Sequence, residues 1–173
     1  MNEKLKELGA ISNNEIKFSK ELNFKKIEKK LNFKFPKEYK NMIKEFNGNS
    51  IGFKQGIQYI PKVAPPIVTK KGYLGLDFFY GINEGNLNIF SENKSYIDIL
   101  PSNLITIGLV LSGDEICFDR VTKNIIYWWH EASSFNEQVF LISNTFSDFL
   151  NILEANEEKI SNNIILESSY LDF

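Results

Sequence analysis

The sequence has little of the residue types that build disulfide, metal and membrane sites. It contains one cysteine, Cys117, which excludes an intrachain disulfide, and one histidine, His130, which excludes a metal site made of several imidazoles. No apolar run approaches the roughly 18 residues that a membrane-spanning helix needs. The N-terminal residues mix acids and bases and lack the apolar core of a secretory signal. These absences predict a cytoplasmic protein without a metal ion, another cofactor or a membrane contact.

The usual catalytic motifs are also missing. No glycine-rich phosphate loop followed by Lys-Ser/Thr occurs, and no nucleophile elbow. An enzyme could still be built around Asp114, Asp119 and His130, with His130 as the acid–base group. Asp114, however, follows a glycine, as is typical of a turn, and Asp119 precedes Arg120, as in a charge pair at a strand end. We therefore predict a protein that is not an enzyme, with this catalytic site as the open alternative.

Charge is unevenly distributed along the chain. Residues 1–46 carry 12 lysines and seven glutamates, whereas the remainder carries eight basic and 15 acidic residues. A short lysine cluster at residues 25–30 is the only nucleic-acid signal, and a chain with a pI near 5.6 is a poor nucleic-acid reader. We expect no direct nucleic-acid contact. The acidic remainder is suited to attracting a basic partner.

Three segments are predicted to be helices. The first spans about residues 20–31. The second spans residues 36–47, with Pro36 at the first helical position, where its missing N–H costs nothing, and Asn47-Gly48 at the left-handed end. The third spans residues 145–155 and begins with Thr145 as the cap. The predicted core residues are Tyr39, Ile43, Phe46, Ile107, Phe149 and Leu153.

The middle of the chain has the texture of strands and turns. The best strands are predicted at 104–111, 115–119 and 125–129, and their short connections favour an antiparallel meander. Weaker predictions for the rest are strands at 58–60, 73–80 and 87–90, a proline-rich loop at 61–66, and a short helix over 92–99 capped by Ser91. The predicted fold class is α+β, with N-terminal helices and a C-terminal helix packed on a mainly antiparallel β-sheet. We expect one domain over residues 1–173, with its core at 18–155 and an extra segment at 156–173.

Three motifs in this order resemble the SUKH superfamily, in particular the branch related to yeast cell-wall-assembly and killer-toxin-resistance regulators. They are FKKIEKKLNFKFPKEYKNMIKEFNG, ITIGLVLSGDEICFDRVTKNIIYWWHE and TFSDFLNIL. The resemblance covers roughly residues 24–153 and leaves 51–91 unmatched. It implies a sheet backed by helices and, in bacteria, an immunity protein that binds and neutralises a toxin, which in this family is often a nuclease. A regulatory scaffold in cell-envelope or signalling networks is the alternative that the eukaryotic relatives imply.

The strand that ends in Trp128-Trp129 suggests where a partner binds. Neighbouring strand residues point to opposite faces of a sheet, so we expect one tryptophan in the core and the other on the open face or its rim. Exposed aromatics flanked by acids are typical of protein-binding hot spots. The alternative is that segment 51–91 covers the second tryptophan. The predicted partner is a protein, a basic toxin domain, and the predicted contact residues are Asp114, Glu115, Trp128, His130 and Glu131.

Overall fold

The computed structural model describes residues 3–12, 22–83, 87–110, 113–134 and 137–156. Within them the helices are α1 (Glu3–Glu7), α2 (Phe24–Leu31), α3 (Lys37–Glu45), α4 (Ile89–Ser95) and α5 (Phe146–Ile152). The strands are β1 (Ala10–Ser12), β2 (Ile51–Phe53), β3 (Ile57–Tyr59), β4 (Leu74–Leu76), β5 (Phe78–Phe79), β6 (Leu104–Leu109), β7 (Glu115–Asp119), β8 (Ile125–Trp128), β9 (Val139–Ser143) and β10 (Glu154–Ala155). The predicted tail at 156–173 lies, except for residue 156, outside the described residues.

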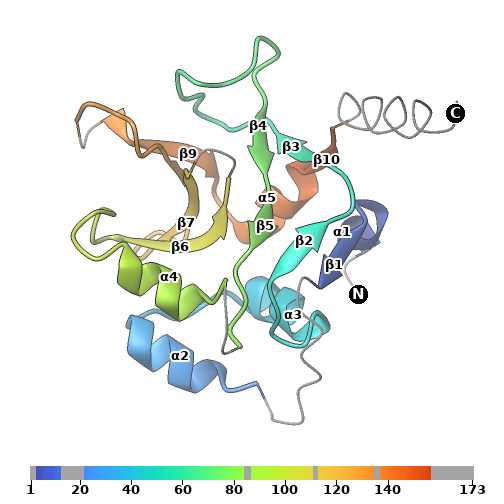
Figure 1. Cartoon of the computed structure of the whole chain (residues 1–173), viewed down its shortest axis with the longest axis vertical. Coiled ribbons are helices and arrows are strands. Elements are labelled where there is room, and N and C mark those ends of the chain that lie inside the picture. Colours follow the sequence, from blue (N-terminus) through green and yellow to red (C-terminus); the bar gives the residue numbers. More distant parts are fainter. Residues whose placement is uncertain (1–2, 13–21, 84–86, 111–112, 135–136, 157–173) are drawn as a thin grey trace, which may run out of the picture.

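The strands form two antiparallel sheets (Figure 1). The larger one has seven strands in the order β1-β2-β5-β6-β7-β8-β9, and the smaller one has the order β10-β3-β4. Strands β6 to β9 are consecutive in the chain and in the sheet, which confirms the predicted meander and adds β9, a strand that we did not predict. The α+β class with a mainly antiparallel sheet is therefore confirmed.

The helix ends follow their capping residues. α2 begins at Phe24 because the Asn23 side chain accepts a hydrogen bond from the N–H of Lys26, and the residues before Leu22 in the predicted helix are outside the described part. Pro36 is the cap of α3 and not its first helical residue. Asn47 and Gly48 both have positive φ angles, as predicted for a helix end.

The closing helix keeps its predicted start but not its end. The Thr145 hydroxyl accepts a hydrogen bond from the N–H of Asp148, which confirms the cap. The helix stops at Ile152, three residues earlier than predicted, because Glu154 and Ala155 pair with β3 as strand β10. A partner strand almost a hundred residues away in the chain thus decides where the last helix ends.

The segment between α3 and β6 departs most from the predictions. Residues 87–90 are not a strand, because Asn88 accepts hydrogen bonds from the N–H groups of Phe90 and Ser91 and starts α4 at Ile89. Ser91 is therefore inside α4 and does not cap it. The predicted strand 73–80 is divided between β4 in the small sheet and β5 in the large one. The loop at 61–66 is confirmed, and its N–H groups at Lys62 and Val63 donate to β9.

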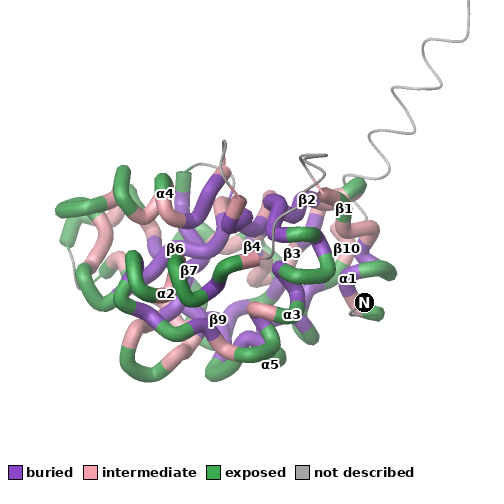
Figure 2. The backbone as a smooth tube through the Cα atoms, turned by 90° about the horizontal axis from the view of Figure 1, so that it is seen from below, coloured by how far each residue is buried: buried purple, intermediate pink, exposed green. Residues whose placement is uncertain are grey.

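One face of the large sheet carries the main core, which is rich in aromatic rings. Tyr39 of α3 lies 4.9 Å from Phe35, 5.5 Å from Phe118 and 5.2 Å from Phe146, measured between ring centroids. All six predicted core residues are buried. Figure 2 shows the buried chain running through the central strands with exposed segments around them. Dense packing of this kind makes the sheet a rigid support for whatever lies on its other face.

Candidate functional site

On the α4 side of the large sheet, aromatic and acidic side chains form a row that the Glu115 carboxylate joins in the middle. The rings of His130 and Trp128 lie 6.4 Å apart, and those of Trp128 and Tyr96 lie 5.6 Å apart. The rings of Tyr80 and Phe78, at the other end of the row, are separated by 5.5 Å. We call this side of the sheet the acidic aromatic face and define it by Phe78, Tyr80, Glu92, Tyr96, Trp128, His130 and Glu131, of which Tyr80 and Trp128 are buried beneath the others.

The position of α4 on the sheet sets the middle of this face. Thr106 lies beyond the residues of β6 that pair with β5, so its backbone N–H and C=O need other partners. The side chain of Asn93 supplies both: its Oδ1 accepts from the Thr106 N–H at 3.0 Å and its Nδ2 donates to the Thr106 carbonyl at 2.9 Å. This pair of bonds fixes α4 on β6 and brings Glu92 and Tyr96 onto the face.

Glu115 lies beneath the face, between its tyrosines. Its carboxylate accepts hydrogen bonds from the hydroxyls of Tyr80, at 2.9 Å, and Thr106. The pKa of Glu115 is raised to about 7, chiefly by burial and also by the nearby charge of Glu92, which together outweigh the lowering by hydrogen bonds from Thr106, Tyr80 and Tyr96. Glu115 therefore changes its protonation state near neutral pH and can alter the charge of the whole face.

Asp114 joins the turn after β6 to the end of β8. Its carboxylate accepts hydrogen bonds from the Tyr127 hydroxyl and from the His130 N–H at 3.0 Å, and it lies 2.7 Å from Nδ1 of the His130 ring. Gly113, with φ of +87°, makes the turn that brings Asp114 there. The arrangement holds the imidazole at the edge of the face.

The structure does not assemble the alternative catalytic site. Asp114 and His130 are in contact, but Asp119 lies at the opposite end of β7. There its carboxylate accepts hydrogen bonds from the N–H groups of Val121 and Thr122 and from the side chain of Asn103, which hold the turn between β7 and β8. Cys117 is buried, and burial raises the pKa of its thiol well above the usual value, which disfavours a nucleophilic thiolate.

The predicted contact residues separate into a buried set and an exposed pair. Asp114, Glu115 and Trp128 are 1%, 0% and 2% exposed, so they lie beneath the surface, and their part in binding a partner stays a prediction. The side chains of His130 and Glu131 are 36% and 69% exposed. The two tryptophans do point to opposite faces, but Trp128 is covered by Tyr96, in the turn after α4, and has no open side.

Four members of the face were missed by the sequence analysis. Phe78 and Tyr80 alternate along one extended segment, and Glu92 and Tyr96 are one helical turn apart. Both spacings place two side chains on one side of their element. These spacings are visible in the sequence, but only the order of the strands shows that the two segments lie on the same side of the sheet.

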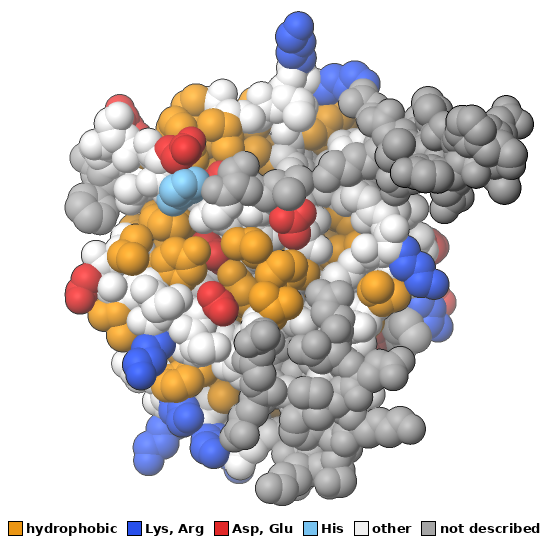
Figure 3. Space-filling model, in the orientation of Figure 1, with side chains coloured by type: hydrophobic (Ala, Val, Ile, Leu, Met, Phe, Trp, Pro, Cys, Tyr) orange, Lys and Arg blue, Asp and Glu red, His pale blue; other side chains and the backbone are white. Residues whose placement is uncertain are grey.

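The surface view agrees with this description (Figure 3). Hydrophobic side chains gather in the middle of the view, with the single histidine at their edge and acidic side chains beside and among them. Lysine and arginine side chains gather at the lower left, over α2. An apolar centre with an acidic surround is suited to a basic protein surface that also offers apolar contacts.

The described ranges also bear on metal sites and on membrane-spanning helices. They contain no group of three or more His, Cys, Asp or Glu side chains arranged to hold a metal ion. Among the helices of these same ranges, none combines the length and apolar character required to cross a membrane.

Comparison with known proteins gives one family and one informative relative. The model of the family described as SMI1 / KNR4 family (SUKH-1) matches residues 19–152. The SPbeta prophage-derived uncharacterized protein YokK of Bacillus subtilis (strain 168) is 28% identical over 134 residues, covering 73% of this chain and 70% of that protein. No solved structure matches the chain.

Proposed function

The chain belongs to the SMI1 / KNR4 family (SUKH-1), and from this membership we propose that it is a protein-binding module that performs no catalysis. More specifically, we propose an immunity protein that binds a basic toxin domain and neutralises it. A nuclease is one example of such a toxin. The proposed place of action is the cytoplasm. That compartment is reducing, which suits a chain whose single cysteine, Cys117, is a free and buried thiol. The acidic aromatic face is the proposed contact surface.

The observation that carries this proposal is the combination of aromatic rings and carboxylates on one rigid face. Phe78 and Tyr96 are partly exposed, and they lie among Glu92, His130 and Glu131. Aromatic side chains supply large contact areas at little cost in conformational entropy, and they are enriched in binding hot spots. Acids around such a centre attract a basic protein and speed the encounter. Nucleases are basic because they hold phosphates.

The buried carboxylates act on binding through the groups that they hold. Asp114 fixes His130, and Glu115 fixes Tyr80. A side chain that is held before binding loses less entropy when the complex forms. Because Asp114 and Glu115 are buried, we propose that they support the contact surface and do not touch the partner themselves.

Charge reversal of Glu92, which is half-buried, and of Glu131, which is exposed, tests the proposal. We expect the double variant Glu92→Lys/Glu131→Lys to associate with the proposed basic toxin domain at least about tenfold more slowly at low salt. The salt dependence of the association rate should also become weaker, because fewer opposite charges attract one another. Stopped-flow or surface-based kinetics at several salt concentrations would measure both effects, after circular dichroism has shown that the variant is folded.

A matched control is available on α1. Glu3→Lys/Glu7→Lys changes the net charge by the same amount at exposed positions far from α4 (Figure 1). This control should keep most of the association rate. Equal losses of association rate in the two variants would mean that only the net charge of the chain matters. An unchanged rate in the folded Glu92/Glu131 variant would mean that the acidic aromatic face is not the contact surface.

A further inference from the structure

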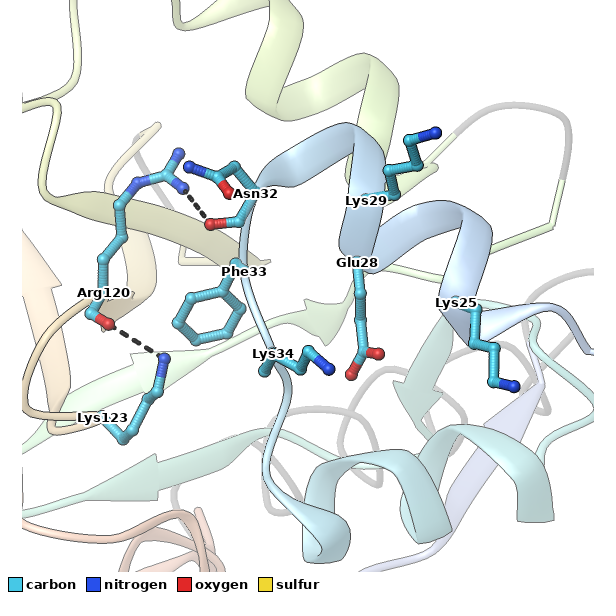
Figure 4. A pocket seen from close by; sticks show the side chains of 8 residues that line it. All are labelled: Lys25, Glu28, Lys29, Asn32, Phe33, Lys34, Arg120 and Lys123. Atoms are coloured by element: carbon cyan, nitrogen blue, oxygen red, sulfur yellow. Dashed lines mark hydrogen bonds between the residues drawn. The ribbon is translucent and has the colours of Figure 1, made fainter.

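A basic pocket lies at the other end of β7 from the acidic aromatic face. It has a volume of about 460 Å³ and is formed by α2, by the link after α2 and by the turn between β7 and β8 (Figure 4). Its lining consists of Lys25, Glu28, Lys29, Asn32, Phe33, Lys34, Arg120 and Lys123. Five of these eight residues are cationic, which is unusual in a chain whose net charge is −2.

Arg120 is held in this pocket by neutral groups. Its Nε donates to the Ser102 carbonyl at 2.9 Å, and its Nη1 donates to the Leu31 carbonyl at 2.6 Å. The bond to Leu31 covers a carbonyl at the C-terminal end of α2, which would otherwise repel an anion. Burial lowers the pKa of Arg120, and within the described ranges no carboxylate pairs with it. The guanidinium has five N–H donors, so those of Nη2 remain for another acceptor.

Lys123 is the second cation in this position. Its ammonium lies 3.7 Å from the centroid of the Phe33 ring and donates to the Arg120 carbonyl at 2.9 Å. The pKa of Lys123 is lowered, chiefly by burial, and the neighbouring Arg120 lowers it as well, whereas Asp119 raises it. No ion pair of Lys123 is found among the residues that the structure describes. Two partly desolvated cations thus face one pocket, and such cations gain more from an anion than fully hydrated ones do.

The rim adds more positive charge than the one acid removes. Lys25 and Lys29 are one helical turn apart on α2, and both are exposed, as is Lys34. Glu28 is already engaged, because its Oε1 accepts from the Lys40 ammonium at 3.2 Å and from the Phe35 N–H at 3.0 Å. Figure 4 shows Lys25 and Lys29 extending outward at the rim and Lys34 reaching toward Glu28.

We propose that this pocket binds a compact anion that carries two or more phosphate groups. Its volume lies in the range of small-molecule sites, and arginine and lysine together are suited to phosphate oxygens. A polynucleotide fits less well, because strand binding uses exposed aromatic rings for base stacking, and Phe33, the aromatic side chain that lines the pocket, is buried. The site uses none of the acidic aromatic face, so its occupation does not depend on the proposed toxin.

Calorimetric titration of the full chain with inorganic pyrophosphate tests this proposal. We expect saturable binding at one site that weakens as salt is raised, with inorganic phosphate binding at least about tenfold more weakly. Lys123→Gln, which removes one charge and keeps a polar side chain of nearly the same length, should weaken pyrophosphate binding several-fold. Lys25→Glu/Lys29→Glu at the rim should weaken it by more than about tenfold.

Lys62→Glu/Lys70→Glu is the matched control, since it makes the same charge change at exposed positions of another loop. It should bind pyrophosphate nearly as the unmodified chain does. Absence of saturable binding up to about 10 mM pyrophosphate, well beyond millimolar affinity, would overturn the proposal, and so would an equal loss in the control. A short acidic peptide and a single-stranded RNA serve as further titrants, and tighter binding of either would also overturn it.

Discussion

Replacement of Phe149 by alanine is expected to lower the free energy of unfolding by about 3–5 kcal/mol, the range for a large aromatic removed from a core. Phe149 is fully buried, and its ring lies 5.3 Å from Tyr59 and 6.1 Å from Phe79. Tyr59 belongs to the small sheet and Phe79 to the large one, so this side chain joins both sheets to α5. The cavity would open where three elements meet and could not be closed by the movement of one of them.

Urea unfolding monitored by fluorescence measures this loss. Ile152→Ala, on the same helix but partly exposed, serves as the control and should cost less than about 1.5 kcal/mol. A small domain has only about 5–15 kcal/mol of stability in total, so the Phe149 variant should show a clearly lower midpoint. A loss below about 1 kcal/mol for Phe149→Ala would mean that α5 does not dock on the two sheets as described.

Stability is expected to fall as the pH rises from about 4.5 to about 7, because of Glu115. Burial raises the pKa of this carboxyl from 4.5 to about 7 in the folded chain. Between the two values the folded state holds a proton that the unfolded state has released, so raising the pH favours unfolding. The contribution is complete below pH 4.5 and is lost by pH 7, and it amounts to at most about 3 kcal/mol.

Glu115→Gln isolates this effect, because the amide resembles the protonated carboxyl in shape and charge. At pH 8 the variant should be more stable than the unmodified chain, by up to about 3 kcal/mol, and at pH 4.5 the two should be nearly equal. Glu7→Gln removes one acid from an exposed position of α1. Its free energy of unfolding in urea at each pH shows how much the loss of one exposed acid changes stability. A stability difference between the chain and its Glu115→Gln variant that stays constant from pH 4.5 to 8 would contradict the assignment.

A buried carboxylate that reduces stability at neutral pH is informative about function. Proteins depart from the most stable arrangement mainly at functional sites. Glu115 lies directly beneath the acidic aromatic face and holds Tyr80 there. Its position therefore supports the proposal that this face, rather than another surface, receives the partner.

Family and fold class were accessible from the sequence because the signals behind them are local. The start of α5 depends on Thr145 and Asp148, and the end of α3 depends on Asn47 and Gly48, residues that are adjacent or three apart. The meander of β6, β7 and β8 has turns of a few residues, so its pairing also follows from neighbouring segments. The family match over residues 19–152 includes all of these segments.

The tertiary structure alone decided the segments whose partners are distant in the chain. Asn88 and Ser91 are both suitable caps for α4. The helix begins after Asn88, because this start buries Ile89 and lets Asn93 bond to Thr106. The division of residues 73–80 into β4 and β5 likewise depends on two sheets that no local pattern specifies.

The exposure of the site residues was also decided by tertiary structure. The sequence identified Asp114, Glu115 and Trp128 as notable residues and assigned them to an open face, but Tyr96 packs on Trp128 and contacts Glu115, and Asp114 is held by Tyr127 and His130. Burial is a property of what packs on a residue, and here the covering residue of Trp128 is Tyr96, which lies beyond the segment 51–91 that was expected as the alternative cover. The residue types were therefore readable from the sequence, whereas their division into buried and exposed residues required the tertiary packing.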